Sequence, residues 1–339
     1  MSRVYLDHNA SAPLRDEARA AMLSALGVAG NPSSVHAEGR AARAIVERAR
    51  AQVAVAVGCN AGEVVFTSGA TEAASVLSGF GRVEVERTAH DALWAHRRDG
   101  DGPGVVALGL ANGETGIVGE VPARGGDALL LDVTQAVGRV PFAFSWTEAD
   151  FAVLSAHKLG GPRGVGALIV RDGVDIAPLQ RGGGQEMGRR SGTEDVAGIA
   201  GFGGAAEAAV GDLANGVWGR VAKLRDYLEE AIEAAESDTI LVGKGVTRLP
   251  NTICMVTPGW KGESQVIAMD LAGFAISAGS ACSSGKVREN RVLAAMGYDA
   301  QAAGSAIRVS LGPATTKDEV ARFAAAWSER RKKLRDRAA

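Results

Sequence analysis

The segment that most constrains the fold runs from Phe151 to Val170 and reads FAVLSAHKLGGPRGVGALIV. Its first four residues, Phe151 to Leu154, form an apolar run short enough to be one buried strand. Polar residues and a Gly/Pro turn follow, and a second apolar run then extends from Val165 to Val170. Lys158, placed directly after the first run, is therefore expected at the mouth of a sheet, partly out of water.

Partial burial gives such a lysine a specific chemistry. Desolvation lowers the pKa of an amine and frees its lone pair for attack on an aldehyde. Lys158 is therefore a candidate for holding pyridoxal phosphate (PLP) as a Schiff base. The alternative is an ordinary surface lysine, because Gly-rich turns after strands are common.

Composition limits the classes of protein that remain. With 339 residues, of which 46% are hydrophobic, the chain can bury a large core and is expected to form two domains. A formal net charge of -2 gives no general attraction to nucleic acid or to anionic membranes. No secretory signal or membrane-length apolar run is present, and three widely spaced cysteines suit a reducing compartment. These features predict a cytoplasmic protein without a zinc site or a disulfide framework.

A second apolar run that ends in a charged residue extends from Ala128 to Asp132. Burying the Asp132 carboxylate costs several kcal/mol unless a partner is present. The protonated pyridine nitrogen of PLP is such a partner, and the carboxylate keeps the ring an electron sink. A loop or capping role for Asp132 is the alternative.

Three further segments place polar residues after strands or at helix starts. The run from Val64 to Thr67 predicts a strand, and residues 68–71 a turn that opens a helix, which suits phosphate or an ordinary cap. His90 either stacks on a cofactor ring, acts in proton transfer or caps a helix. The strand expected at 105–110 ends beside Asn112, where ligands bind in open α/β sheets.

Two residues in the last third of the chain suggest chemistry. Cys282 lies among small residues, which predicts an exposed loop, and Lys286 would help to lower the pKa of its thiol. An incidental cysteine in a turn is the alternative. Arg308 lies within an apolar strand at 306–311, and a guanidinium there usually holds a carboxylate. Helices are expected at 37–57, at 194–236 with a break near 214–216, and at 317–339.

Taken together, the motifs closely resemble those of NifS/IscS-type cysteine desulfurases, which are class V members of PLP fold type I. The motifs that carry the resemblance, all of them in family order, are YLDHNASAP (5–13), NPSSVH (31–36), FTSGATE (66–72), DVTQ (132–135), SAHK (155–158), GGGQE (182–186), RSGT (190–193) and SAC (280–282). The stretch around Cys282 resembles the long cysteine loop of group I enzymes.

The resemblance implies an α/β fold with two domains. Residues 14–210 would form a large PLP-binding domain with a mixed, mostly parallel sheet flanked by helices. Residues 1–13 and 211–339 would form a smaller α+β domain that carries the cysteine loop. It also implies a cytoplasmic homodimer that converts L-cysteine to L-alanine.

The resemblance further implies a role for each matching residue. Lys158 would bind the cofactor and move protons, Asp132 would pair with the pyridine nitrogen, and Gln135 would contact the ring hydroxyl. Arg308 would grip the substrate carboxylate, and Cys282 would carry the sulfur as a persulfide. The remaining implied contacts are His90 stacked on the ring, Asn112 at the ring and substrate, and Ala70, Thr71, Ser155, His157 and, from the second subunit, Thr193 at the phosphate.

The implied partners are L-cysteine and a sulfur acceptor such as an iron–sulfur scaffold. No resident metal is implied, although the Cys282 persulfide could meet an iron–sulfur cluster on a partner. The chain departs from the family pattern at Gly113, at His8 and Asn9, and in a short segment between His90 and Asn112. The alternatives are a selenocysteine lyase, another class V aminotransferase, or a sulfur-transfer scaffold of low activity.

Overall fold

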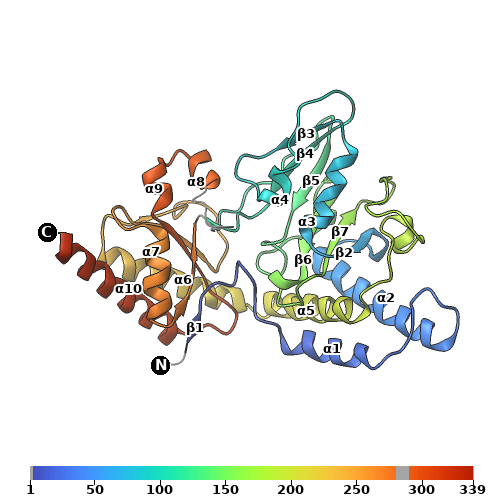
Figure 1. The fold of residues 1–339 in the computed structure, drawn as a ribbon, viewed down its shortest axis with the longest axis horizontal. Helices are drawn as coiled ribbons and strands as arrows, with labels where there is room; N and C mark the ends of the chain where they lie inside the picture. The colour runs from blue at the N-terminus through green and yellow to red at the C-terminus, as the bar shows by residue number, and fades with distance from the viewer. Residues whose placement is uncertain (1–2, 280–289, 339) are drawn as a thin grey trace. The chain divides into compact units, whose positions relative to one another are not determined.

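The computed structural model describes residues 3–279 and 290–338, and these form two compact units (Figure 1). The large unit comprises residues 11–111 and 119–215. The small unit comprises residues 1–10, 112–118 and 216–339. The chain thus crosses from one unit to the other several times, and a short internal segment, 112–118, belongs with the ends of the chain.

The large unit is built on a six-stranded sheet with the order β2-β7-β6-β5-β4-β3. Its strands are β2 (Val64–Thr67), β3 (Arg82–Val85), β4 (Gly104–Gly109), β5 (Ala128–Asp132), β6 (Phe151–Ser155) and β7 (Gly166–Val170). β7 runs antiparallel to both of its neighbours, and the remaining pairs are parallel. The predicted mixed, mostly parallel sheet is therefore confirmed.

Helices cover both faces of this sheet, which explains why its central strands are apolar along their length. The helices are α1 (Asp16–Leu26), α2 (Ala37–Val57), α3 (Ala70–Ala73), α4 (Asp91–Trp94) and α5 (Val196–Ala214), with short 3-10 turns at 61–63, 74–79, 144–146, 156–158 and 186–188. On one face, Val65 and Leu130 pack in one cluster with Leu77 and Leu93. On the other, Phe66 meets Phe202 of α5 edge-on at 6.2 Å.

Two adjacent glycines let α5 approach α1 and α2 closely. A Cβ on Gly203 would lie 2.8 Å from Ala49 of α2, and one on Gly204 would lie 2.9 Å from the carbonyl oxygen of Glu17 in α1. Side chains at these positions would push the helices apart. The helical segments expected at 37–57 and, with a break at 215–216, from 194 onward are confirmed.

The small unit pairs an antiparallel sheet, ordered β11-β12-β9-β8, with helices. The strands of this sheet are β8 (Ile240–Leu241), β9 (Thr252–Val256), β11 (Ser277–Ala278) and β12 (Ala306–Ser310), while β1 (Val4–Tyr5) and β10 (Phe274–Ala275) form a separate parallel pair. The helices are α6 (Val217–Ala235), α7 (Gly262–Leu271), α8 (Arg291–Ala295), α9 (Ala300–Gly304) and α10 (Lys317–Ala338). Trp327 of α10 is fully buried against Trp260 and donates to Gln265 of α7. The predicted α+β character is confirmed.

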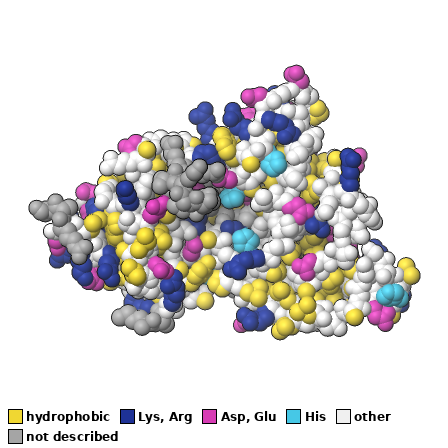
Figure 2. Space-filling view, viewed as in Figure 1, with side chains coloured by type: hydrophobic (Ala, Val, Ile, Leu, Met, Phe, Trp, Pro, Cys, Tyr) yellow, Lys and Arg dark blue, Asp and Glu magenta, His cyan; other side chains and the backbone are white. Residues whose placement is uncertain are grey.

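The surface carries both signs of charge, interspersed with hydrophobic side chains that gather over α1 at the lower right of Figure 2. Leu23 and Leu26 of α1 are 64% and 69% exposed. Exposed apolar side chains that lie together mark an interaction surface more often than scattered ones do. Within the described part of the chain, no helix combines the length and the apolar character needed to cross a membrane.

Candidate active site

The carboxyl ends of the parallel strands bring the polar segments of the large unit to one edge of its sheet. β2, β6, β5, β4 and β3 share one direction, so the residues that follow them emerge together. In open α/β sheets, ligands bind outside this edge. The segments that follow the strands are 68–71, 156–158, 133–135, 110–111 and 86–90. These segments contain six of the predicted site residues, and Asp132 and Ser155 are the last residues of β5 and β6; the six are Ala70, Thr71, His90, Gln135, His157 and Lys158.

A hydrogen bond connects the segments that follow β2 and β6. The Ala70 amide donates to Ser155 Oγ at 2.8 Å, and both residues are buried. Because the hydroxyl oxygen of Ser155 accepts here, its proton remains available to donate to an anion. The backbones pack closely at this point, since a Cβ on Gly166 would lie 2.5 Å from Gly69 Cα. The Ala70 amide thus orients Ser155 Oγ and leaves the Ser155 O–H as the donor.

His157 lies one residue before the candidate lysine and is half-buried. Its Nδ1 lies 3.3 Å from Ser11 Oγ, and its carbonyl accepts from the Ala12 amide at 2.9 Å. Burial, followed by the positive charges of Lys158 and Arg163, lowers the pKa of His157 from 6.5 to about 4. The imidazole is therefore neutral at physiological pH and contributes one N–H donor.

This shift predicts a specific loss of stability in acid. His157 has a pKa near 6.5 when unfolded and about 4 when folded, so the unfolded state binds more protons between these values. The free energy of unfolding should therefore fall as the pH drops from 6.5 toward 4. Thermal melts of the cofactor-free protein over this range test the effect. His157→Asn should make the melting temperature less dependent on pH. The control His36→Asn replaces an exposed histidine that caps a helix, and it tests whether the loss of any histidine has this effect.

Asp132 is the last residue of β5 and Gln135 lies in the turn after it, and β5 neighbours β6, the strand that leads to Lys158. Asp132 is half-buried, and its Oδ1 accepts from the Thr134 amide at 2.9 Å, which fixes the carboxylate at the strand end. Gln135 is buried, and its Oε1 accepts from Arg139. Arg139 also donates to the Lys158 carbonyl at 3.0 Å. The sequence did not single out Arg139, whose VGR context reads like a surface turn.

His90 and Thr71 lie at the same sheet edge and are exposed. His90 caps α4, because its Nδ1 accepts from the Ala92 amide at 3.1 Å. This is the capping role that the sequence had left open beside ring stacking. A capping bond to Nδ1 leaves the ring faces available, so the two roles are compatible.

Thr193 is exposed at the end of a Gly-rich segment, 180–193. The segment is tied to the sheet through Glu186, whose carboxylate accepts from Arg50 at 2.7 and 2.8 Å and from the Phe66 amide at 2.8 Å. Arg50 and Glu186 are almost fully buried, and breaking such a pair costs about 3–5 kcal/mol. Arg190 pairs with Glu72 at 2.9 Å. Thr193 therefore projects from a firmly anchored segment.

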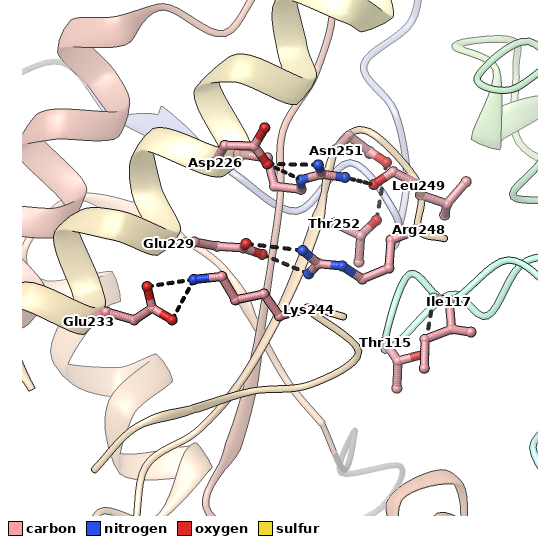
Figure 3. A network of polar contacts seen from close by, with 11 residues as sticks. Thr115, Ile117, Asp226, Glu229, Glu233, Lys244, Arg248, Leu249, Asn251 and Thr252 are labelled. Carbon is pink, nitrogen blue, oxygen red and sulfur yellow. Dashed lines mark hydrogen bonds and ion pairs between the residues drawn. The ribbon is translucent and has the colours of Figure 1, made fainter. Parts of the chain in front are cut away.

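Asn112 belongs to the small unit, where its turn is fixed by its own side chain. Asn112 Oδ1 accepts from the amides of Glu114 and Thr115, each at 2.9 Å. The segment docks beside β9, as the Leu249 amide donates to the Gly116 carbonyl at 2.7 Å. Gly116 has φ +76°, and a Cβ there would lie 2.8 Å from Thr252. Figure 3 shows Thr115 and Ile117 of this segment together with the polar contacts around Arg248.

Polar contacts around Arg225 and Arg248 hold residues 248 and 249, which precede β9, against α6. Arg248 forms a buried, two-bonded pair with Glu229, at 2.6 and 3.0 Å (Figure 3). Arg225 donates to the Leu249 carbonyl and to Asp226. These contacts fix residues 248 and 249 to α6.

Arg308 lies in β12 of the small unit, with its side chain 12% exposed. Its Nη2 donates to Asp7 Oδ1 at 2.7 Å and to Ser277 Oγ at 3.1 Å, and its Nη1 donates to the Gly113 carbonyl at 3.1 Å. Nε is buried and has no hydrogen-bond partner among the described residues. The expected carboxylate partner is thus partly supplied by Asp7, which the sequence analysis had not identified because it lies 301 residues away.

The large unit offers the donor set that PLP requires. Hydroxyl, imidazole and backbone N–H donors lie at the strand ends near Ser155, and the Asp132 carboxylate and the Lys158 amine follow neighbouring strands. These groups match a phosphate, a pyridine nitrogen and an aldehyde. The residues present therefore fit the cofactor.

Two cysteines lie within the described residues, and neither is a nucleophile at neutral pH. Burial raises the pKa of Cys59 and of Cys254 to about 12 in each case. Thiolate is the reactive form, so both thiols are inert. Cys282, the predicted persulfide carrier, lies outside the described residues.

Comparison with known proteins gives consistent results. A model of the class-V aminotransferase family matches residues 4–86 and 86–323. A cysteine desulfurase of Cereibacter sphaeroides is 41% identical over 95% of this chain and 94% of its own length. A cysteine desulfurase IscS of Dictyoglomus turgidum is 35% identical over 94% of this chain and 91% of its own. A solved NifS-like protein superposes with a TM-score of 0.89 at 29% identity, over 97% of this chain and 99% of its own.

Proposed function

Because the chain belongs to the class-V aminotransferase family and, within it, to the cysteine desulfurases, we propose that it converts L-cysteine to L-alanine and collects the sulfur as a persulfide on Cys282. The observation that carries the proposal is the arrangement of Lys158, Asp132 and Ser155. They lie at the ends of two neighbouring parallel strands, where an α/β sheet binds its ligand.

The proposed cofactor is PLP, held in the large unit, residues 11–111 and 119–215. Lys158 holds it covalently, Asp132 pairs with the pyridine nitrogen, Gln135 binds the ring hydroxyl and His90 covers the ring face. The hydrogen bond from Ala70 to Ser155 supports this assignment, because it orients the Ser155 hydroxyl and leaves its O–H to donate to a phosphate. The other phosphate contacts are Thr71 and His157 of the same subunit, and Thr193 of the partner subunit.

The small unit, residues 1–10, 112–118 and 216–339, provides the contacts to the substrate. Arg308 binds the carboxylate of L-cysteine, which the unpartnered Nε supports because it is a buried donor. Asn112 orients the amino acid at the ring. PLP supplies an electron sink for the charge left when Cα loses its proton. The Lys158 amine moves that proton and returns one to the product.

Cys282 completes the reaction as the nucleophile. Its thiolate attacks the substrate sulfur, so an S–S bond forms while the carbon–sulfur bond breaks, and the electron pair of that bond stays with the carbon skeleton that becomes alanine. The persulfide is a reversible sulfur carrier. The raised pKa values of Cys59 and Cys254 support this assignment, because both thiols are protonated at neutral pH.

The proposal includes a cytoplasmic homodimer that passes sulfur to an acceptor protein such as an iron–sulfur scaffold. The exposed apolar residues of α1 support a subunit contact. A transient persulfide and unpaired cysteines suit a reducing compartment.

A turnover assay tests the proposal. The protein reconstituted with PLP should release alanine and sulfide from L-cysteine in the presence of a reductant. Cys282→Ser should release neither, while Cys59→Ser should match the native rate because that thiol is half-buried and protonated. Native protein that binds PLP yet releases no alanine would refute the proposal. Turnover of L-selenocysteine alone would instead identify a selenocysteine lyase.

A further inference from the structure

Arg139 is a buried arginine that joins the two residues we assign to the cofactor ring and to its covalent bond. It is 4% exposed. One guanidinium nitrogen, Nη1, donates to Gln135 Oε1, and the other, Nη2, donates to the Lys158 carbonyl at 3.0 Å. Arg139 thus connects the turn after β5 with the turn after β6 through one rigid, planar group.

The contact decides which way the Gln135 amide faces. A guanidinium has only donors, so the atom of Gln135 that meets it must be the carbonyl oxygen. The other end of the amide is therefore Nε2, which is a donor. A donor is what an ionised ring hydroxyl needs, whereas the opposite orientation would place two acceptors against each other.

Arg139 also brings a permanent positive charge into a buried position. Charges interact strongly where water is excluded, and a cation disfavours a further positive charge nearby. The hydrogen bond to the Lys158 carbonyl places that charge beside the backbone of the reactive lysine. His157 and Arg163 are charged or titratable groups of the same segment. Asp132 ends the neighbouring strand, and Arg15 donates to the Leu159 carbonyl at 2.7 Å and pairs with Asp212.

We propose that Arg139 is a positioning residue for the cofactor: it fixes the Gln135 amide as a donor to the ring oxygen and holds the backbone of Lys158. The inference rests on the proposed function, because it presumes that PLP is bound. It predicts that the bound cofactor responds electronically to a residue that does not touch it.

The test is a pH titration of the absorption of bound PLP, with the melting temperature measured in parallel. Arg139→Met removes both the cation and the donor that meets Gln135 Oε1, so the apparent pKa of the cofactor absorption should rise by about one unit. Arg139→Lys keeps the charge but can reach only one of the two partners, so its pKa should lie between the native value and that of Arg139→Met. Gln135→Glu keeps the partner of Arg139 but replaces the donor with an acceptor, so it should also raise this pKa.

Arg171→Met is the matched control. Arg171 likewise donates to backbone carbonyls, those of Ala149, Phe144 and Thr147, yet these lie at the opposite end of β6 from Lys158. It should lower the melting temperature without moving the titration. If Arg139→Met and Arg139→Lys lower the melting temperature while the titration stays at the native pKa, Arg139 is merely structural and the inference is wrong. A native protein that takes up no PLP would instead refute the proposed function, and the inference with it.

Discussion

Replacing Lys158 by alanine should lower alanine formation from L-cysteine by at least about 10³-fold. The variant loses both the covalent attachment of the cofactor and the base that moves the Cα proton, and positioned proton transfer alone contributes about 10²–10⁴-fold. The other residues of the proposed cofactor site should keep their positions, because Arg139 donates to the Lys158 backbone carbonyl and this bond does not involve the lysine side chain. The variant should therefore still fold and retain PLP noncovalently.

Borohydride reduction followed by peptide mass spectrometry checks the attachment directly. The native protein should carry the cofactor mass on the peptide that contains Lys158, and Lys158→Ala should carry none. Lys223→Ala, at an exposed position of α6, is the control and should behave as native. Alanine formation by Lys158→Ala within tenfold of the native rate would show that another amine does the chemistry.

Local patterns in the sequence predicted the framework of this site well. The apolar runs at 64–67, 128–132 and 151–154 each form a strand of the large sheet, and the polar residues that end them emerge at its carboxyl edge. Such runs are readable because a strand covered on both faces must be apolar along its length. The helix at 37–57 was equally clear from its periodic apolar stripe and ends at Gly58, which adopts a left-handed φ of 70°.

Contacts between distant parts of the chain could not be predicted in the same way. Asp7 meets Arg308, and Glu186 meets Arg50, across 301 and 136 residues respectively. No local periodicity encodes such pairs, since they arise only after the units have folded. Arg139 was missed for a related reason, because its burial depends on the turn between β5 and β6 and not on its neighbours in sequence.

Two departures from the family pattern, Asn9 and Gly113, are explained by hydrogen bonds in the small unit. Asn9 is buried, and its Nδ2 donates to the Gly113 carbonyl at 3.0 Å and to Thr252 Oγ1 at 2.8 Å. Its Oδ1 accepts from Asn251 at 3.0 Å. Two of the unusual positions thus contact each other, and the bond fixes the turn that follows Asn112. The backbone of Gly113 also anchors Arg308.

Replacing Arg308 by lysine should raise the KM for L-cysteine by about 10- to 100-fold while changing kcat much less. A hydrogen bond to a charged group contributes about 1.5–3 kcal/mol, and a contact made equally in the ground and transition states appears in KM. Lysine keeps the charge but has a single nitrogen. Arg308 binds Gly113 through Nη1 and Asp7 through Nη2, and it has Nε as a third donor for the substrate carboxylate.

Arg225→Lys provides the matched control for this substitution. Arg225 also lies in the small unit and also donates to one carboxylate, that of Asp226, and to one backbone carbonyl, that of Leu249. Its substitution should leave KM unchanged, so a shift seen only in Arg308→Lys reports on the substrate carboxylate and not on general loosening of the unit. Asp7→Asn should move KM in the same direction as Arg308→Lys, because it removes the partner that orients the guanidinium. Equal effects of the Arg225 and Arg308 variants on KM would contradict the assignment of Arg308.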